Sequence, residues 1–231
     1  MKKIFLVCII GLLFSSCVHD PIAGEPIIPK VLEPRDTSKV YFVNDLLPIL
    51  RSSCAVPGCH DAATPAANIN LTSYESILAS KVGGEPILVP GKPLQSKLYR
   101  ATRGLDILVA MPTPFNFQIT DKDKNMIAKW IAQGALNNEC EYTCDEGEIT
   151  YFGTIRPLID KYCTGCHYGL YPSDDILLET HGQVAELALN GKLYNALLGQ
   201  NGVARMPQLA AMPDCEIAQI KKWIDAGAPR N

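Results

Sequence analysis

An internal repeat constrains the fold of this chain more than any other feature of its sequence. Six short blocks occur twice in the same order, which indicates a tandem duplication. The paired blocks start at Tyr41 and Tyr151, Pro48 and Pro157, Cys59 and Cys166, Lys97 and Lys192, Met111 and Met206, and Trp130 and Trp223. The repeat predicts two small domains, residues 37–139 and 147–231, joined by a connector at 140–146. A core of that size is marginal, so we expect a bound cofactor to complete it.

The residue pattern within each repeat predicts a mostly α fold. Residues 42–53 and 152–162 are expected to form the helix that leads into a cysteine motif. The segments between the histidine and the methionine of each repeat contain Gly and Pro, and we expect loops with short helical pieces there.

The last helix of each repeat is the clearest element. Its apolar residues recur at i, i+3 and i+4 spacing, which is typical of a helix with one buried face. These residues are Ile127, Trp130 and Ile131 in the first repeat, and Ile217, Ile220 and Ile224 in the second. Thr120 and Asp214 are the expected N-caps, and Gly134 and Gly227 are the expected C-terminal stops.

The N-terminus has the order of a secretory signal. Two lysines precede an eleven-residue apolar run and two small residues: Lys2, Lys3, Ile4 to Phe14, Ser15 and Ser16. The run is too short for a permanent membrane span. With Cys17 next, the stretch resembles a bacterial lipobox, which predicts a cleaved lipoprotein signal at 1–16 and a lipid on Cys17. An ordinary cleaved signal is the alternative. Residues 17–36 hold four prolines and are expected to form a flexible tether.

The second repeat contains Cys163-Thr164-Gly165-Cys166-His167, the spacing used for covalent attachment of c-type haem. Two thiols add to the two vinyl groups of the haem, and the adjacent His becomes a ligand of the iron. A disulfide between Cys163 and Cys166 would leave His167 without a role. A zinc site needs four ligands, and a thioredoxin-like pair belongs to an α/β domain. The motif therefore predicts haem.

The first repeat contains a longer version of the motif, with four residues between Cys54 and Cys59 and with His60 following. Alone, this spacing also suits a disulfide. Because the flanking blocks match the second repeat, we expect the same cofactor, with Pro57 and Gly58 turning the extra residues. The sequence thus predicts two covalently attached c-type haems.

A methionine is the expected second axial ligand of each iron, because its soft sulfur favours the ferrous state. Three methionines precede a proline, namely Met111, Met206 and Met212. Their spacing to the last tryptophan of each repeat favours Met111 and Met206, with Met212 as the alternative in the second repeat. Met126 is expected in the core. His181 is expected at the surface, although it could also make a bis-His haem.

The cysteine count indicates an exported protein. Of nine cysteines, Cys8 lies in the signal, Cys17 is assigned to lipid and four to haem. Three remain, and one disulfide is expected among Cys140, Cys144 and Cys215. A bond from Cys140 or Cys144 to Cys215 and a local Cys140–Cys144 bond are both open. The formal charge of −3 shows no basic excess, so we expect no nucleic-acid partner.

Both repeats resemble the small c-type cytochrome domains of bacterial envelope lipoproteins, including the planctomycete-type cytochrome C family. The shared pattern is an aromatic-led helix, the Cys/His motif, a Met-Pro loop and a last helix that ends Trp-Ile-x-x-Gly-Ala. It covers residues 40–136 and 149–229 and departs from the family at the four-residue gap of the first motif. The resemblance implies two class I-like cytochrome c domains of mostly α fold, and electron transfer.

These observations together predict a lipid-anchored dihaem electron carrier of the cell envelope rather than an enzyme. Its partners would be other redox proteins of the envelope and, through the lipid, the membrane. A dihaem peroxidase is one alternative, but it needs an open position on one iron and a distal acid–base group. A disulfide-stabilised surface module without haem is the other alternative. The sequence does not indicate an oligomeric state.

Overall fold

The structure is a computed structural model that describes residues 32–105, 110–112, 119–144, 147–208 and 211–231. Within this part the protein has eight α-helices and one two-stranded sheet, which confirms the mostly α prediction. No helix of the described ranges is long and apolar enough to cross a bilayer. The expected signal at 1–16 and the expected lipid site Cys17 lie outside the described residues.

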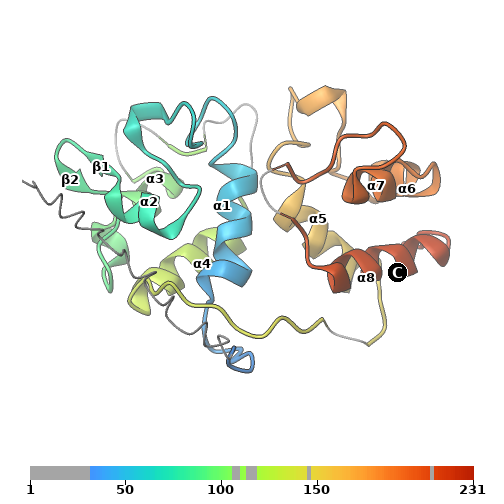
Figure 1. Cartoon of the computed structure of the whole chain (residues 1–231), viewed down its shortest axis with the longest axis horizontal. Coiled ribbons are helices and arrows are strands. Elements are labelled where there is room, and N and C mark those ends of the chain that lie inside the picture. Colours follow the sequence, from blue (N-terminus) through green and yellow to red (C-terminus); the bar gives the residue numbers. More distant parts are fainter. Residues whose placement is uncertain (1–31, 106–109, 113–118, 145–146, 209–210) are drawn as a thin grey trace, which may run out of the picture. The chain divides into compact units, whose positions relative to one another are not determined.

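The elements follow one another in two groups (Figure 1). The first group is α1 (Leu47–Ser53), α2 (Tyr74–Ala79), β1 (Lys81–Val82), β2 (Glu85–Pro86), α3 (Lys97–Thr102) and α4 (Asp121–Ala132). The second group is α5 (Arg156–Tyr162), α6 (His181–Leu189), α7 (Lys192–Leu198) and α8 (Asp214–Asp225). We call residues 32–139 the first half and residues 147–231 the second half.

The helix that leads into each cysteine motif forms as predicted, but its first turn is wider than an α-helix. Phe42–Leu46 (η1) and Tyr151–Ile155 (η4) have π-type hydrogen bonding and run directly into α1 and α5. A proline occupies the first turn of both α-helices, where its missing N–H costs nothing.

The last helix of each half also forms as predicted, with one correction at its start. Thr120 caps α4, because its hydroxyl accepts from the Asp123 N–H at 3.1 Å and its own N–H donates to the Asp123 carboxylate at 3.2 Å. Asp214 was expected to cap α8, and this is wrong. The N-cap position is Pro213, which has no capping side chain, and Asp214 is the first helical residue. Its carboxylate therefore stabilises α8 only through its charge near the positive end of the helix dipole.

Gly134 and Gly227 end these two helices as expected. Their φ angles are +98° and +87°, a conformation that glycine adopts without a steric penalty. Each is followed by a buried alanine, Ala135 or Ala228, whose N–H donates to the carbonyl of the helix tryptophan at 2.9 or 3.0 Å. The chain thus returns across the end of each last helix in the same way.

Each half has its own cluster of buried apolar side chains, and residues 32–231 form one compact unit. The tryptophan of the last helix lies in the cluster and is 1% exposed in both halves. Trp130 packs on Phe42 with ring centroids 5.3 Å apart, and Trp223 packs on Tyr151 at 5.6 Å, both with ring planes inclined by 32°. Trp130, which was expected on the buried face of its helix, is thus confirmed as a core residue, and Trp223 has the matching place in the second half.

The segments between histidine and methionine contain the predicted short helical pieces in the first half and are more regular than predicted in the second. The second half has two full helices there, and α6 begins with a capping box in which Thr180 and Gln183 bond each other's backbone N–H groups. The first half has the short helices α2 and α3 and a hairpin that pairs Lys81 with Pro86. The sequence shows only weak helical periodicity in these segments. Their helices are stable because they pack on the cores of the two halves.

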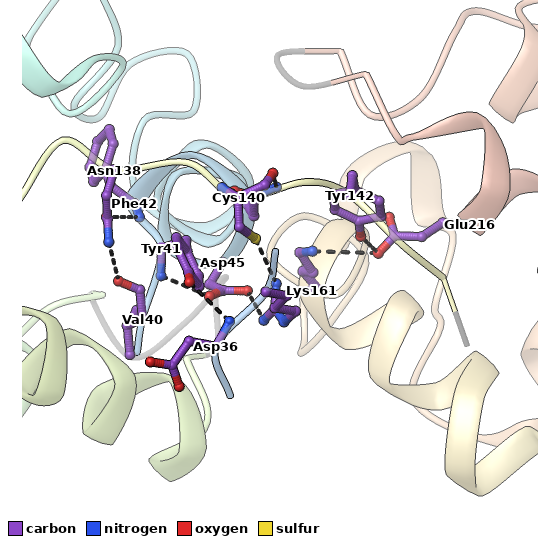
Figure 2. A network of polar contacts seen from close by, with 12 residues as sticks. Asp36, Val40, Tyr41, Phe42, Asp45, Asn138, Cys140, Tyr142, Lys161 and Glu216 are labelled. Atoms are coloured by element: carbon purple, nitrogen blue, oxygen red, sulfur yellow. Dashed lines mark hydrogen bonds and ion pairs between the residues drawn. The ribbon is translucent and has the colours of Figure 1, made fainter. Parts of the chain in front are cut away.

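The connector is packed against both halves (Figure 2). Just before it, Asn138 accepts from the Phe42 N–H at 2.8 Å and donates to the Val40 carbonyl at 3.1 Å. At its first residue, the Cys140 N–H donates to the side-chain oxygen of Asn44 in the first half at 3.0 Å. Within the connector, the Tyr142 hydroxyl bonds the Glu216 carboxylate of the second half. The connector therefore contacts the first half at its start and the second half further along.

The expected tether is too long at its C-terminal end. Glu33 pairs with Cys140 in an isolated parallel bridge, and the Glu33 carbonyl accepts from the Glu141 N–H at 2.8 Å. Arg35 forms an ion pair with Asp45 at 2.6 Å. Residues 33–36 therefore belong to the folded unit, because the connector offers them backbone partners and Asp45 of the first half offers a charged one.

Candidate haem-binding sites

The second motif forms a tight turn directly after α5. The Cys163 N–H still donates to the Ile159 carbonyl at 2.9 Å, as in the helix. The Cys163 carbonyl then accepts from the N–H groups of Cys166 and His167 at 3.1 and 3.0 Å. This turn brings both thiols and the imidazole to one side of the helix end.

A cavity lies beside this turn, and all four predicted residues of the second site line it. Cys163, Cys166, His167 and Met206 share a cavity of about 290 Å³. Pockets for small organic ligands begin at about 300 Å³. The structure therefore brings together two thiols, an imidazole and a thioether around a cavity at the lower limit of that size range.

The His167 ring is oriented by the backbone. Its Nδ1 lies 3.2 Å from the Ile176 carbonyl oxygen. Because a carbonyl can only accept, Nδ1 carries the proton in the neutral ring and Nε2 carries the lone pair. Metal-binding histidines are usually oriented through such a bond from the second ring nitrogen. His167 is also 8% exposed, so its position is restricted by packing.

The first motif has the same arrangement around His60. The His60 N–H donates to the Cys54 carbonyl at 3.1 Å, and His60 Nδ1 lies 3.2 Å from the Ile69 carbonyl oxygen. His60 is 9% exposed. The two extra residues between Cys54 and Cys59 thus leave the histidine with the same tautomer and the same type of partner as in the second motif.

The chain beyond the two histidines also follows matching paths. The carbonyl of the second cysteine accepts from Ala66 N–H at 2.6 Å in the first half and from Ser173 N–H at 2.9 Å in the second. Ala67 and Asp174 then both have φ of 53°, an unusual left-handed conformation for residues with a side chain. The predicted correspondence of the two motifs is therefore accompanied by matching backbone geometry.

The predicted methionine ligands occupy matching positions. The Met111 N–H donates to the Ala101 carbonyl at 2.9 Å after α3, and the Met206 N–H donates to the Ala196 carbonyl at 2.8 Å after α7. Met206 lines the second cavity, whereas the alternative Met212 is 5% exposed within the hydrophobic cluster. Met126 packs against the first cluster, as expected. The geometry thus favours Met206 over Met212.

The motif cysteines are free thiols in the structure. Burial, followed by the charge of the neighbouring motif cysteine, raises the pKa of Cys54 and of Cys163 to about 12. Burial also raises the pKa of Cys59 and Cys166. A disulfide within either motif, which was the competing interpretation, is not what the structure contains.

The disulfide lies elsewhere and joins Cys144 of the connector to Cys215 of α8. The sequence left three pairings open, and this is one of them. Cys140 is the remaining thiol and is fully buried, with Arg35 Nη1 donating to its sulfur at 3.6 Å. A local Cys140–Cys144 bond is therefore excluded.

His181 was expected to be solvent-exposed, and the structure shows it half-buried instead. Its ring packs edge-on against Tyr151 with centroids 4.6 Å apart, and its Nε2 lies 3.0 Å from the Ala228 carbonyl oxygen. Tyr74 has the matching place in the first half, where its hydroxyl donates to the Ala135 carbonyl at 2.9 Å. His181 therefore supports the end of the last helix, and its Nε2 is engaged away from the cavity.

Other residues of the cavity carry no sequence signal. Tyr162 and Pro207 adjoin predicted site residues, so their presence is unsurprising. The remaining members are Arg51, Ser52, Val56, Pro57, Ser173, Asp174 and Gln208. The first four come from the first half of the chain, and no local pattern could predict that they approach the second motif.

The donor set suits an iron that is already held by a macrocycle. Among the described residues, no cluster of three or more His, Cys, Asp or Glu side chains could hold a bare metal ion. A haem iron receives four ligands from its porphyrin and needs only one or two from the protein. His167 and Met206 can supply these, and Cys163 and Cys166 can supply the two thioethers. The residues therefore fit a c-type haem.

A comparison with protein families gives an independent result. Residues 57–114 match the family Planctomycete cytochrome C. The matched stretch includes Cys59, His60 and Met111 and begins just after Cys54. No curated protein and no solved structure matches the chain significantly. The matched stretch is therefore similar to the planctomycete family, and the match supports a cytochrome c-like domain in the first half. Domains of this class carry covalently bound haem c.

Proposed function

We propose that this protein is a lipid-anchored dihaem cytochrome c that carries electrons between redox proteins of the cell envelope. The observation that carries the proposal is the second cavity, where Cys163, Cys166, His167 and Met206 lie together. Covalent attachment, a nitrogen ligand and a sulfur ligand are the three protein contributions that such a haem requires.

The chain's own residues have separate tasks in this function. The thiols of Cys163 and Cys166 would hold the haem covalently, each through a thioether to one of its vinyl-derived carbons. The backbone carbonyl of Ile176 holds the proton of His167 on Nδ1 and so directs Nε2 to the iron. The haem supplies one-electron chemistry, and the surrounding side chains set its potential through ligation and burial.

The matching geometry of the first motif supports a second haem in the same chain. His60 has the same backbone acceptor arrangement as His167, and Met111 has the same backbone bond as Met206. The family match lies on this first motif. We therefore assign Cys54, Cys59, His60 and Met111 to the first haem, in the domain at 37–139.

The haem count tests the proposal directly. We expect two haems per chain by alkaline pyridine haemochrome and by intact mass. The variants C54A/C59A and C163A/C166A should each retain one, whereas Cys140→Ala should retain two because Cys140 lies outside both motifs. One haem in the wild-type chain would contradict the assignment of the first site, and none would contradict the function.

The envelope location rests on the N-terminal sequence. Cleavage before Cys17 and acylation of its thiol would anchor the protein, with burial of each acyl CH₂ contributing about 0.8 kcal/mol. We expect the wild-type chain in the membrane fraction and the Cys17→Ser variant released from it, with an unchanged haem count. A wild-type chain whose mass shows no acyl groups would contradict the anchor and leave the haem proposal intact.

A further inference from the structure

The cavity beside the second motif has walls from both halves of the chain. Cys163, His167 and Met206 of the second half line one part of it. The first half contributes residues from the end of α1 and from the gap of its own cysteine motif, namely Arg51, Ser52, Val56 and Pro57. A pocket formed only by its own domain would not contain these four residues.

The two halves make a close contact at the same place. Position 165 has no room for a side chain, because a Cβ there would lie 2.0 Å from the Ser52 carbonyl oxygen. The Ser52 hydroxyl donates to the Lys161 carbonyl at 2.9 Å, and the Cys166 sulfur lies 3.7 Å from the Ser52 carbonyl oxygen. Helices α1 and α5 pack against each other here. The middle glycine of the second motif is thus a contact residue between the halves.

The four-residue gap of the first motif supplies two of the wall residues. Val56 is 4% exposed, yet it belongs to neither hydrophobic cluster. It lines the cavity together with Pro57, which is the next residue of the gap. A two-residue gap, as in the second motif, would have fewer residues with which to reach this wall.

We propose that the second haem is bound between the two halves, and that Val56 and Pro57 in the long gap of the first motif form part of its pocket. This inference rests on the proposed function. The first half then excludes water from the second haem, which disfavours the charged ferric state and raises the reduction potential. The longer gap of the first motif thus helps to form the pocket of the second haem.

The variant Gly165→Ala tests the contact, and Gly182→Ala is its matched control. A Cβ at Gly182 would meet no atom within 4 Å, and this glycine does not require a positive φ. Both holoproteins are compared by spectroelectrochemical titration and by the rate of cyanide binding to oxidised haem. Met206→His replaces sulfur by nitrogen and lowers the potential of its haem, which identifies the wave of the second haem.

We expect Gly165→Ala to shift the second-haem wave to lower potential and to leave the first wave unchanged. Cyanide should bind the second haem about tenfold faster, the change that corresponds to pocket opening made easier by about 1.4 kcal/mol. Gly182→Ala should match the wild type. A Gly165→Ala protein that holds two haems and has wild-type potentials and cyanide-binding rates would overturn this inference and leave the proposed function intact. A wild-type chain without haem would overturn the proposed function.

Val56→Ala provides a second test in case the bulkier residue at position 165 prevents folding. Removal of two methyl groups opens the wall without forcing the halves apart. We expect the second-haem wave to shift further than the first. A shift confined to the first haem would show that Val56 serves only its own motif and would contradict the shared pocket.

Discussion

Cys144 and Cys215 are joined by a disulfide across 71 residues of sequence, with their Cα atoms 5.9 Å apart. The bond ties the connector to the first turn of α8. One residue further along α8, Glu216 accepts the hydroxyl of Tyr142 and pairs with Lys161 at 3.5 Å (Figure 2). The connector is therefore held to the second half by a covalent bond and by a buried polar cluster.

Loss of this disulfide should destabilise the protein. Because the bond restricts the unfolded chain, we expect the C144S/C215S double variant to lose about 2–4 kcal/mol of unfolding free energy. Denaturant titration of the holoprotein measures the change. Dithiothreitol should produce a similar loss in the wild type and none in the variant, since it does not cleave thioethers. An unchanged midpoint in the double variant would contradict the structural role of the bond.

The two candidate methionines of the second half should behave differently. Met206→Leu should abolish the near-infrared sulfur–iron band of the second haem and lower its potential, because Met206 lines the cavity. Met212→Leu should keep the band and cost less than about 1.5 kcal/mol of stability, as a volume-conserving change in a core. Absorption spectra of the oxidised variants show which methionine ligates the second haem. Loss of the band in Met212→Leu would reverse the assignment.

Stability should fall at alkaline pH because of two tyrosines beside Glu216. Burial, followed by the hydrogen bond to Glu216, raises the pKa of Tyr142; burial, followed by the charge of Glu216, raises that of Tyr162. Above about pH 10 the unfolded chain ionises these groups while the folded protein does not, so the folded state loses relative stability. We expect unfolding midpoints to decline above that pH, and to decline less in Y142F/Y162F. Equal slopes in both proteins would contradict this origin.

The capping box of α4 should contribute measurably to stability. Thr120→Ala removes the acceptor of the Asp123 N–H and should cost about 1 kcal/mol of unfolding free energy. Asp214→Ala at the start of α8 removes no capping bond and should cost about 0.3–1 kcal/mol through the helix dipole alone. Thermal unfolding of the two variants compares these effects, and a larger loss in Asp214→Ala than in Thr120→Ala would contradict the observed cap positions.

Local chemistry made much of the fold predictable. The helix that leads into each motif, the Thr120 cap and the glycine stops all depend on residues within a few positions of one another. Trp130 was recognisable as a core residue from helical spacing. The helices α6 and α7 were not recognised, because their short apolar patterns become stable only when packed on a core.

The sequence by itself determined the two cysteine–histidine motifs and indicated haem as the cofactor, because covalent attachment uses two thiols and iron ligation uses the histidine that follows the second one. Only the tertiary structure decided which remaining cysteines pair, that Met206 rather than Met212 faces the cavity, and that His181 supports a helix end. It also placed Val56 of the first half beside the second motif. These outcomes depend on contacts between residues far apart in the chain, which packing and exclusion of water select and local spacing does not encode.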